Sequence, residues 1–222
     1  MSTEVDHLVV AAASLDDGAR WCESTLGVLP SPGGQHPTMG THNRLLKLSS
    51  PAFPQCYLEI IAIDAQAPAP QRLRWFGLDD GVLQGRLARH GPHLIHVVAR
   101  STILETHRRS MVNLGLNPGV PVTAHRDTPA GRLSWQILVR DDGRLEAGGL
   151  VPTLMQWDGP HATTHLPDQG CSLQAVRLDG LPAGAKEVLR LHGVSIDPAA
   201  KPGLHATLRT PRGAVELSGV NA

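Results

Sequence analysis

Two side chains that could carry acid–base or metal chemistry stand in segments that are otherwise apolar. Glu59 lies in the run YLEII at positions 57–61, and His7 directly precedes the run LVV at 8–10. A carboxylate in such a segment faces the protein interior, where an unpaired charge is costly. Glu59 therefore needs a metal ion, a cationic partner or a watery cavity, and it is the candidate catalytic residue. His7, taken alone, is better explained by a hydrogen bond between its ring and the backbone.

A glycine-rich segment, GGQHPTMGTHN at positions 33–43, adds further polar candidates. Its glycines and its proline predict a loop that turns the chain into the next strand. Loops on a rigid scaffold often carry binding groups, so His36, Thr41 and Asn43 are candidate substrate-binding residues. Trp157 is a further candidate substrate-binding residue, because it is expected, together with Trp135, to form the wall of a cavity.

The elements that must position these side chains recur along the chain. The segment DHLVVAA at 6–12 is typical of a buried strand, and the helix after it is capped by Ser14 and ends at Gly27. A second strand, LIHVVA at 94–99, precedes a helix that ends at Gly115. The helix ends LGV and LGL match at an offset of 88 residues. Further strand-like segments follow each helix, so the sequence predicts a βαβββ unit that occurs twice.

This repeat sets the expected domain organisation. We expect one domain over residues 1–158, with modules at about 5–64 and 92–158, and a partial third βαββ module over 171–222. The connector between them contains two prolines, and its His161 and His165 are expected at the surface. Glu216 imitates the pattern around Glu59, but a charge on an exposed edge strand also protects that edge against pairing with other chains.

Composition restricts the class of protein. The 222 residues include 20 basic and 20 acidic side chains and 41% apolar residues. A chain of this length can bury a sizeable core, and its balanced charge argues against nucleic acid or anionic membranes as partners. The three cysteines are far apart and predict neither a disulfide framework nor a structural zinc site. With no basic or long apolar N-terminal segment, we expect a cytoplasmic protein.

Paired βαβββ units, with a histidine in the opening strand and a glutamate in the closing strand, resemble the vicinal oxygen chelate superfamily. This is the glyoxalase, bleomycin resistance and extradiol dioxygenase group. The runs DHLVV, GGQHPTMGTHN and YLEII resemble its glyoxalase-like domain branch over about residues 5–158. The resemblance implies an α+β fold in which the paired βαβββ modules form a curved mixed sheet, with a C-terminal βαββ extension.

The resemblance also implies a site for a divalent metal, which could be Zn, Ni, Fe or Mn. Its ligands would be His7 and His96 from the opening strands and Glu59 and Gln156 from the closing strands. Two features of the sequence argue against it. The two histidines are 89 residues apart although the helix ends differ by 88, so either His96 or Ile95 is the counterpart of His7. Gln156 stands where a metal-binding relative usually has glutamate.

Two classes of function follow from these residues. The first is a metal-dependent lyase, isomerase or dioxygenase that acts on a small oxygenated substrate. The alternative is a metal-free protein of the same fold that binds or sequesters a small molecule. In both cases the expected partner is a small-molecule ligand, and the chain could form a homodimer.

Overall fold

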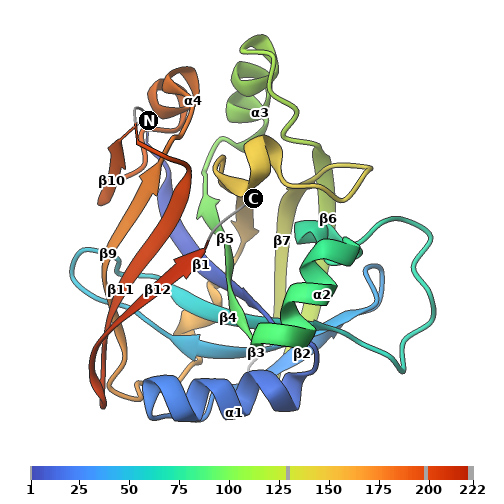
Figure 1. Cartoon of the computed structure of the whole chain (residues 1–222). Helices are drawn as coiled ribbons and strands as arrows, with labels where there is room; N and C mark the ends of the chain where they lie inside the picture. The colour runs from blue at the N-terminus through green and yellow to red at the C-terminus, as the bar shows by residue number, and fades with distance from the viewer. Residues whose placement is uncertain (1, 129–130, 198–199, 220–222) are drawn as a thin grey trace.

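The computed structural model describes residues 2–128, 131–197 and 200–219, and Figure 1 shows the chain. Three successive units share the order strand, helix, strands. The first comprises β1 (Glu4–Ala11), α1 (Leu15–Leu26), β2 (Ser31–His36), β3 (Thr41–Lys47) and β4 (Tyr57–Ile63). The second comprises β5 (His93–Arg100), α3 (Leu104–Asn113), β6 (Val120–Thr128), β7 (Gly131–Val139) and β8 (Thr153–Asp158). The third comprises β9 (Ser172–Asp179), α4 (Ala183–Leu189), β10 (Val194–Asp197), β11 (Gly203–Thr210) and β12 (Gly213–Gly219).

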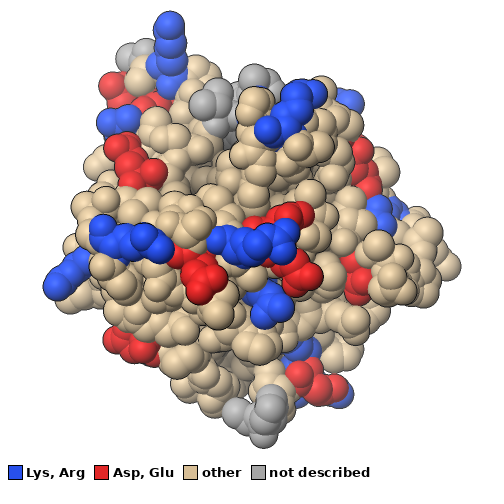
Figure 2. Space-filling view, turned by 60° about the horizontal axis from the view of Figure 1, so that its bottom comes forward, with Lys and Arg blue, Asp and Glu red and all other residues tan. Residues whose placement is uncertain are grey.

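Shorter elements connect these units. Between the first two lie the 3₁₀ helix η1 (Trp75–Gly77) and the helix α2 (Gly81–His90), while η2 (Glu146–Gly149) and η3 (Ala162–Thr164) flank β8. None of the helices in the described part of the chain has the length and apolar character needed to cross a membrane. Figure 2 shows basic and acidic side chains side by side on one face of the molecule.

Local sequence explains the first helix. The Ser14 hydroxyl accepts a hydrogen bond of 3.1 Å from the backbone N–H of Asp17, which satisfies one of the free donors at the helix start. At the other end Gly27 adopts a φ of 82°, and its N–H donates to the carbonyl of Glu23. Glycine adopts this left-handed conformation without strain, so the cap and the stop fall where the sequence predicts them.

The first two units form one eight-stranded sheet in the order β2-β3-β4-β1-β5-β8-β7-β6. The opening strands β1 and β5 pair antiparallel at its centre, and each pairs in parallel with the closing strand of its own unit. The sheet curves so that its edge strands β2 and β6 contact each other. The predicted α+β fold with paired βαβββ modules in a curved mixed sheet is confirmed.

The third unit forms a separate four-stranded sheet in the order β10-β9-β11-β12. The C-terminal extension is thus present as expected, with β10 as one strand more than the predicted βαββ pattern. Its apolar side chains, including those of Leu173, Val176 and Leu204, join the core cluster that contains Leu8 and Leu58. We call this cluster the helix-side core, because residues of α1, α3 and α4 also belong to it.

A second apolar cluster fills the concave side of the eight-stranded sheet, and we call it the cavity-side core. Along β1 the side chains alternate, so that Leu8 and Val10 join the helix-side core while Val9 and Ala11 join the cavity-side core. Trp75 of η1, Leu87 of α2 and Trp135 of β7 complete the cavity-side core. The polar residues of the candidate site lie on this side.

The segment predicted as a loop at positions 33–43 is instead a hairpin. Residues up to His36 belong to β2, and β3 begins at Thr41, which pairs with His36 across a short turn. A register shift between Pro32 and Gln35 accommodates the two glycines in the edge strand. His36, Thr41 and Asn43 are therefore held by sheet pairing rather than by a free loop.

Candidate functional site

His7 and Glu59 meet on neighbouring strands. β1 and β4 run parallel, with His7 opposite Tyr57 and Val9 opposite Glu59, so both polar side chains project from the same face. The Nε2 atom of His7 lies 3.5 Å from Oε2 of Glu59. His7 is 3% exposed and Glu59 is 5% exposed. The two residues that the sequence singled out thus form a buried pair.

Asp6 fixes the other side of the His7 ring. A register shift between Val5 and His7 makes Asp6 the extra residue of β1, and its side chain is fully buried. Its Oδ1 lies 2.7 Å from Nδ1 of His7, and its Oδ2 accepts a hydrogen bond of 2.8 Å from Nε1 of Trp157. His161 lies 3.1 Å from the same Oδ2 through its Nε2. The carboxylate of Asp6 therefore accepts hydrogen bonds from three ring N–H groups.

Charge pairing decides the ionisation of these groups. Burial alone would lower the pKa of His7, but its interactions with the carboxylates of Asp6 and Glu59 outweigh burial and raise the pKa to about 9. Burial works against the ionised forms of Asp6 and Glu59 as well. The histidines around them overcome burial and hold the pKa of each carboxyl below its usual value. At neutral pH an imidazolium thus lies between two carboxylates.

The β2–β3 hairpin supports Glu59 from the other side. Nδ2 of Asn43 donates a hydrogen bond of 2.6 Å to Oε1 of Glu59, and the N–H of Gly34 donates to Oδ1 of Asn43 at 2.8 Å. This backbone bond fixes which end of the amide faces the carboxylate. His36 lies 3.4 Å from Asn43 and 3.0 Å from the Thr41 hydroxyl. Burial lowers the pKa of His36 to about 4, so its ring is neutral.

A small cavity adjoins these groups. Its volume is about 30 Å³, and a water molecule needs about 10–15 Å³ on this measure, so it has room for about two waters. Among the substrate-binding residues proposed from the sequence, His36, Asn43 and Trp157 line it, whereas Thr41 supports His36 from behind. The lining residues are His7, His36, Asn43, Leu45, Tyr57, Glu59, Trp75, Phe76, Arg126, Trp135, Ile137, Met155, Trp157 and Ala162.

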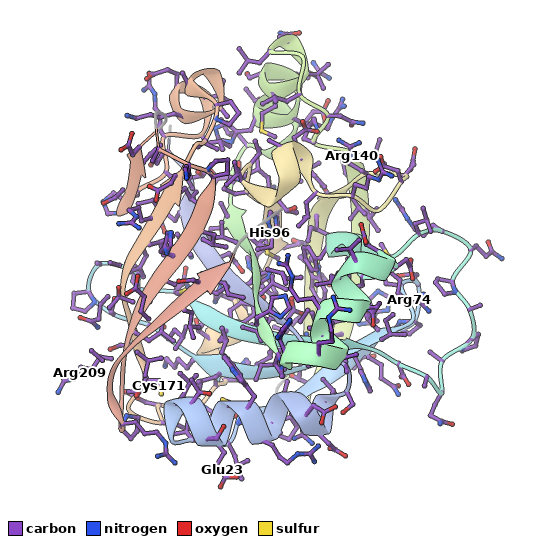
Figure 3. The ribbon with its side chains drawn as sticks, viewed as in Figure 1. Glu23, Arg74, His96, Arg140, Cys171 and Arg209 are labelled. Carbon is purple, nitrogen blue, oxygen red and sulfur yellow. The ribbon has the colours of Figure 1, made fainter. Side chains whose placement is uncertain are left out.

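The structure does not bring His96 or Gln156 to this cavity. His96 lies in the interior (Figure 3), with Nδ1 3.0 Å from the Gly149 carbonyl and Nε2 3.0 Å from both the N–H and the hydroxyl of Thr153. Burial lowers the pKa of His96 to about 3. The side-chain oxygen of Gln156 accepts a hydrogen bond of 3.1 Å from the N–H of Leu104, at the start of α3.

Comparison with known proteins identifies the scaffold. The family profile described as a glyoxalase-like domain matches residues 5–199. This chain belongs to the glyoxalase-like domain family. The resemblance seen in the sequence is therefore confirmed, and the match extends beyond the paired modules into the third unit. No curated protein sequence matches this glyoxalase-like protein significantly.

Solved structures resemble this chain at low sequence identity. A hypothetical protein from Staphylococcus aureus is 13% identical, with a TM-score of 0.59 over 99% of this chain and 86% of that chain. Methylmalonyl-CoA epimerase from Mycobacterium tuberculosis is 18% identical, with a TM-score of 0.41 over 72% of this chain and 91% of that chain. Streptomyces coelicolor methylmalonyl-CoA epimerase in complex with 2-nitronate-propionyl-CoA is 14% identical, with a TM-score of 0.42 over 71% and 97%.

Strand pairing shows how the two halves of this glyoxalase-like protein correspond. His7 pairs with Val98, and Val9 pairs with His96. Adding 89 to the number of His7 gives His96, and adding 89 to the number of Val9 gives Val98, so the two pairs are equivalent. The residue left over in β5 is Ile95, because Val10 already pairs with Leu94. His96 is therefore the counterpart of His7.

The same correspondence identifies the counterpart of Glu59. Val9 pairs with Glu59 in the first unit, and its equivalent, Val98, pairs with Thr153 in the second. The second unit thus has a histidine and a threonine where the first has a histidine and a glutamate.

These residues do not fit the metal that the family resemblance implies. In the second unit both ring nitrogens of His96 are already engaged, and Gln156 is turned toward α3. In the first unit His7 is held between Asp6 and Glu59. Within the described ranges, no group of three histidine, cysteine, aspartate or glutamate side chains is arranged to hold a metal ion.

Sequence reasoning missed three residues that are central to the site: Asp6, His161 and Arg126. His161, expected at the surface, is 5% exposed, and its partner Asp6 lies 155 residues away in the chain, so no local pattern announces the contact. Arg126 reaches the cavity from β6. Its only signal is indirect, because the glycines at 33 and 34 leave space that a side chain from another strand can fill.

Proposed function

We propose that this glyoxalase-like protein binds a small oxygenated molecule at the His7–Glu59 cavity and transfers a proton through Glu59 without a metal ion. This is chemistry of the isomerase or lyase type. The observation that carries the proposal is a buried carboxylate with one oxygen fixed by Asn43 and the other directed to a cationic histidine. Perturbed carboxyl and imidazole groups at a cavity are typical of functional sites.

The two oxygens of Glu59 have different tasks in this proposal. Oε1 accepts the short hydrogen bond from Asn43 and is thereby positioned. Oε2 lies 3.5 Å from Nε2 of His7, which is longer than an ordinary hydrogen bond of up to about 3.2 Å. Oε2 therefore retains a lone pair for a proton of the bound molecule.

His7 and Asp6 keep this base in its reactive form. The lowered pKa of Glu59 means that the carboxylate is ionised at neutral pH. When Oε2 takes a proton, the positive charge of His7 remains balanced by Asp6, which stays ionised because its pKa is lowered as well. The free-energy cost of changing the charge of Glu59 in the protein interior is thus limited. His7 and Asp6 act here as positioning residues.

Hydrogen–deuterium exchange tests the proposal. The protein, dialysed against EDTA, is incubated in D₂O with small 2-oxo and 2-hydroxy compounds, and loss of the C–H signal is followed by ¹H NMR. We expect exchange that Glu59→Gln slows by at least about 100-fold, the range for a lost general base. The control, Glu216→Gln, changes an exposed carboxylate on β12 and should leave the rate unchanged.

Other outcomes separate the competing functions. Exchange that disappears after EDTA dialysis and returns with Zn, Ni, Fe or Mn would support the metal-dependent enzyme instead. Ligand binding without exchange would support the metal-free binding protein. Equal exchange rates in the wild type and in Glu59→Gln would refute the role of Glu59 as the base.

A further inference from the structure

Arg126 lines the cavity from the edge of the curved sheet opposite to the β2–β3 hairpin. It belongs to β6, whereas His36 and Asn43 come from the hairpin at the opposite edge, yet all three line the same cavity. Arg126 is half-buried. Its guanidinium therefore adds a positive charge to the cavity from a strand that is far from Glu59 in the strand order.

Two buried donors that adjoin the cavity, one on Arg126 and one on Trp75, have no partner in the described part of the protein. The Nε atom of Arg126 is buried and has no hydrogen-bond partner among the residues that the structure describes, and the same holds for Nε1 of Trp75. Trp75 is only 4% exposed. Glu59, the carboxylate of the cavity, is paired with His7 instead. Because unpaired buried donors are costly, this wall is suited to a ligand that brings acceptor oxygens.

The absence of a side chain at Gly34 makes room for Arg126. A Cβ at position 34 would lie 2.2 Å from Cδ of Arg126, and one at position 33 would lie 2.1 Å from Oδ1 of Asn43. The neighbouring glycines of β2 thus allow two polar side chains to approach the backbone closely. This explains the Gly-Gly pair of the glycine-rich segment, since any larger residue at position 34 would displace Arg126.

We propose that Arg126 binds the carboxylate of the ligand, so that the protein selects small carboxylic acids over neutral carbonyl compounds. A carboxylate matches the planar donor fork of a guanidinium and can accept two hydrogen bonds from it. Trp75 donates to a second oxygen of the same ligand. This assignment rests on the proposed function in one respect, namely that the cavity next to Glu59 is the ligand site.

The charge of the site favours a small acid, and the site must enlarge to admit one. Asp6 and Glu59 are already paired with His7, whereas Arg126 is a cation of the cavity lining with no carboxylate partner among the residues that the structure describes. The cavity of about 30 Å³ is smaller than such a ligand. Because Arg126 is only half-buried, its side chain can move outward and close again on the bound carboxylate.

Binding of matched acids and neutral compounds tests the assignment. The probes are pyruvate and lactate, with diacetyl and acetoin as neutral analogues in which a methyl ketone replaces the carboxylate. Affinities are measured by NMR titration. The wild type should bind each acid at least about tenfold more tightly than its analogue. Arg126→Met should weaken binding of the acids by about 10- to 150-fold, the range for a lost hydrogen bond to a charged group, and change binding of the analogues less than about threefold.

A second pair of variants keeps the test independent of the arginine substitution itself. Gly34→Ala displaces Arg126 without removing it and should also weaken acid binding selectively. Gly81→Ala adds a methyl group in open space on α2 and should have no effect. Thermal unfolding confirms that each variant is folded.

The outcomes distinguish this assignment from the proposed function. Selective loss of acid binding in Arg126→Met, with or without an effect of Glu59→Gln on exchange, supports the carboxylate anchor. The assignment is overturned if neither acid binds the wild type, or if acids and analogues lose affinity equally. Loss of exchange in Glu59→Gln with unchanged acid binding in Arg126→Met would uphold the base and refute the anchor.

Discussion

Raising the pH from 6.5 to about 8.5 should destabilise the protein through His7. Folding raises the pKa of this residue from 6.5 to about 9, so in this window the folded protein retains a proton that the unfolded chain releases. Stability from a raised pKa is complete below the unfolded value and is lost as the pH rises through the folded value. One proton changes the unfolding free energy by about 1.4 kcal/mol per pH unit, so we expect a loss of about 2 kcal/mol across the window.

Other buried groups contribute little to the change in unfolding free energy between pH 6.5 and about 8.5. Burial lowers the pKa of His36 to about 4 and of His96 to about 3, so their contributions stop changing once the pH exceeds the ordinary value of 6.5. Burial raises the pKa of Cys22 to about 12 and of Cys171 to about 11, and these thiols matter only near and above their ordinary value of 9.0. His7 should therefore dominate the slope.

Urea unfolding followed by tryptophan fluorescence at several pH values measures this slope. His7→Gln should remove most of the decline above pH 6.5, whatever its effect on the overall stability. His165→Gln, which changes an exposed histidine of the connector, should retain the decline. A flat profile in the wild type, or the same slope in His7→Gln, would refute the assignment of a charged His7 between two carboxylates.

Two predictions concern the frame around the site, and both are measured by chemical denaturation. Gly33→Ala should lower the unfolding free energy by about 1–3 kcal/mol, because the new methyl group would lie 2.1 Å from Oδ1 of Asn43; an effect as small as that of Gly81→Ala would contradict this. Thr153→Val should cost about 1 kcal/mol by removing the hydroxyl 3.0 Å from Nε2 of His96, and unchanged stability would show that this bond contributes nothing.

The fold follows from local patterns that the sequence displays. Strand alternation, the Ser14 cap and the glycine stop at position 27 predict the repeated unit, and the structure has it. The register at the sheet centre was not predictable, because the extra residues Asp6 and Ile95 shift the pairing without changing the apolar pattern. The hairpin at 31–43 was missed for a related reason, since its glycines and proline are typical of turns but lie at a sheet edge.

The site was predictable only where polar residues interrupt apolar strands. Glu59 and His7 stand out for this reason. The partners that decide their ionisation come from distant parts of the chain, such as His161 from the connector. Gln156 occupies a position that the family resemblance marks as a ligand, but the start of α3 offers its side chain a backbone donor. Such competition between partners depends on three-dimensional packing and leaves no trace in the local sequence.

The pair His7 and Glu59 in the first half corresponds to the pair His96 and Thr153 in the second, so the two halves of this protein place different chemistry at equivalent positions. In the second half a hydroxyl occupies the position of the carboxylate, and the histidine links η2 to β8. Introducing a carboxylate by Thr153→Glu would give the second half the histidine–glutamate pair of the first, with Ile95 in the place of Asp6, and the scaffold thereby offers a route to a protein with two sites.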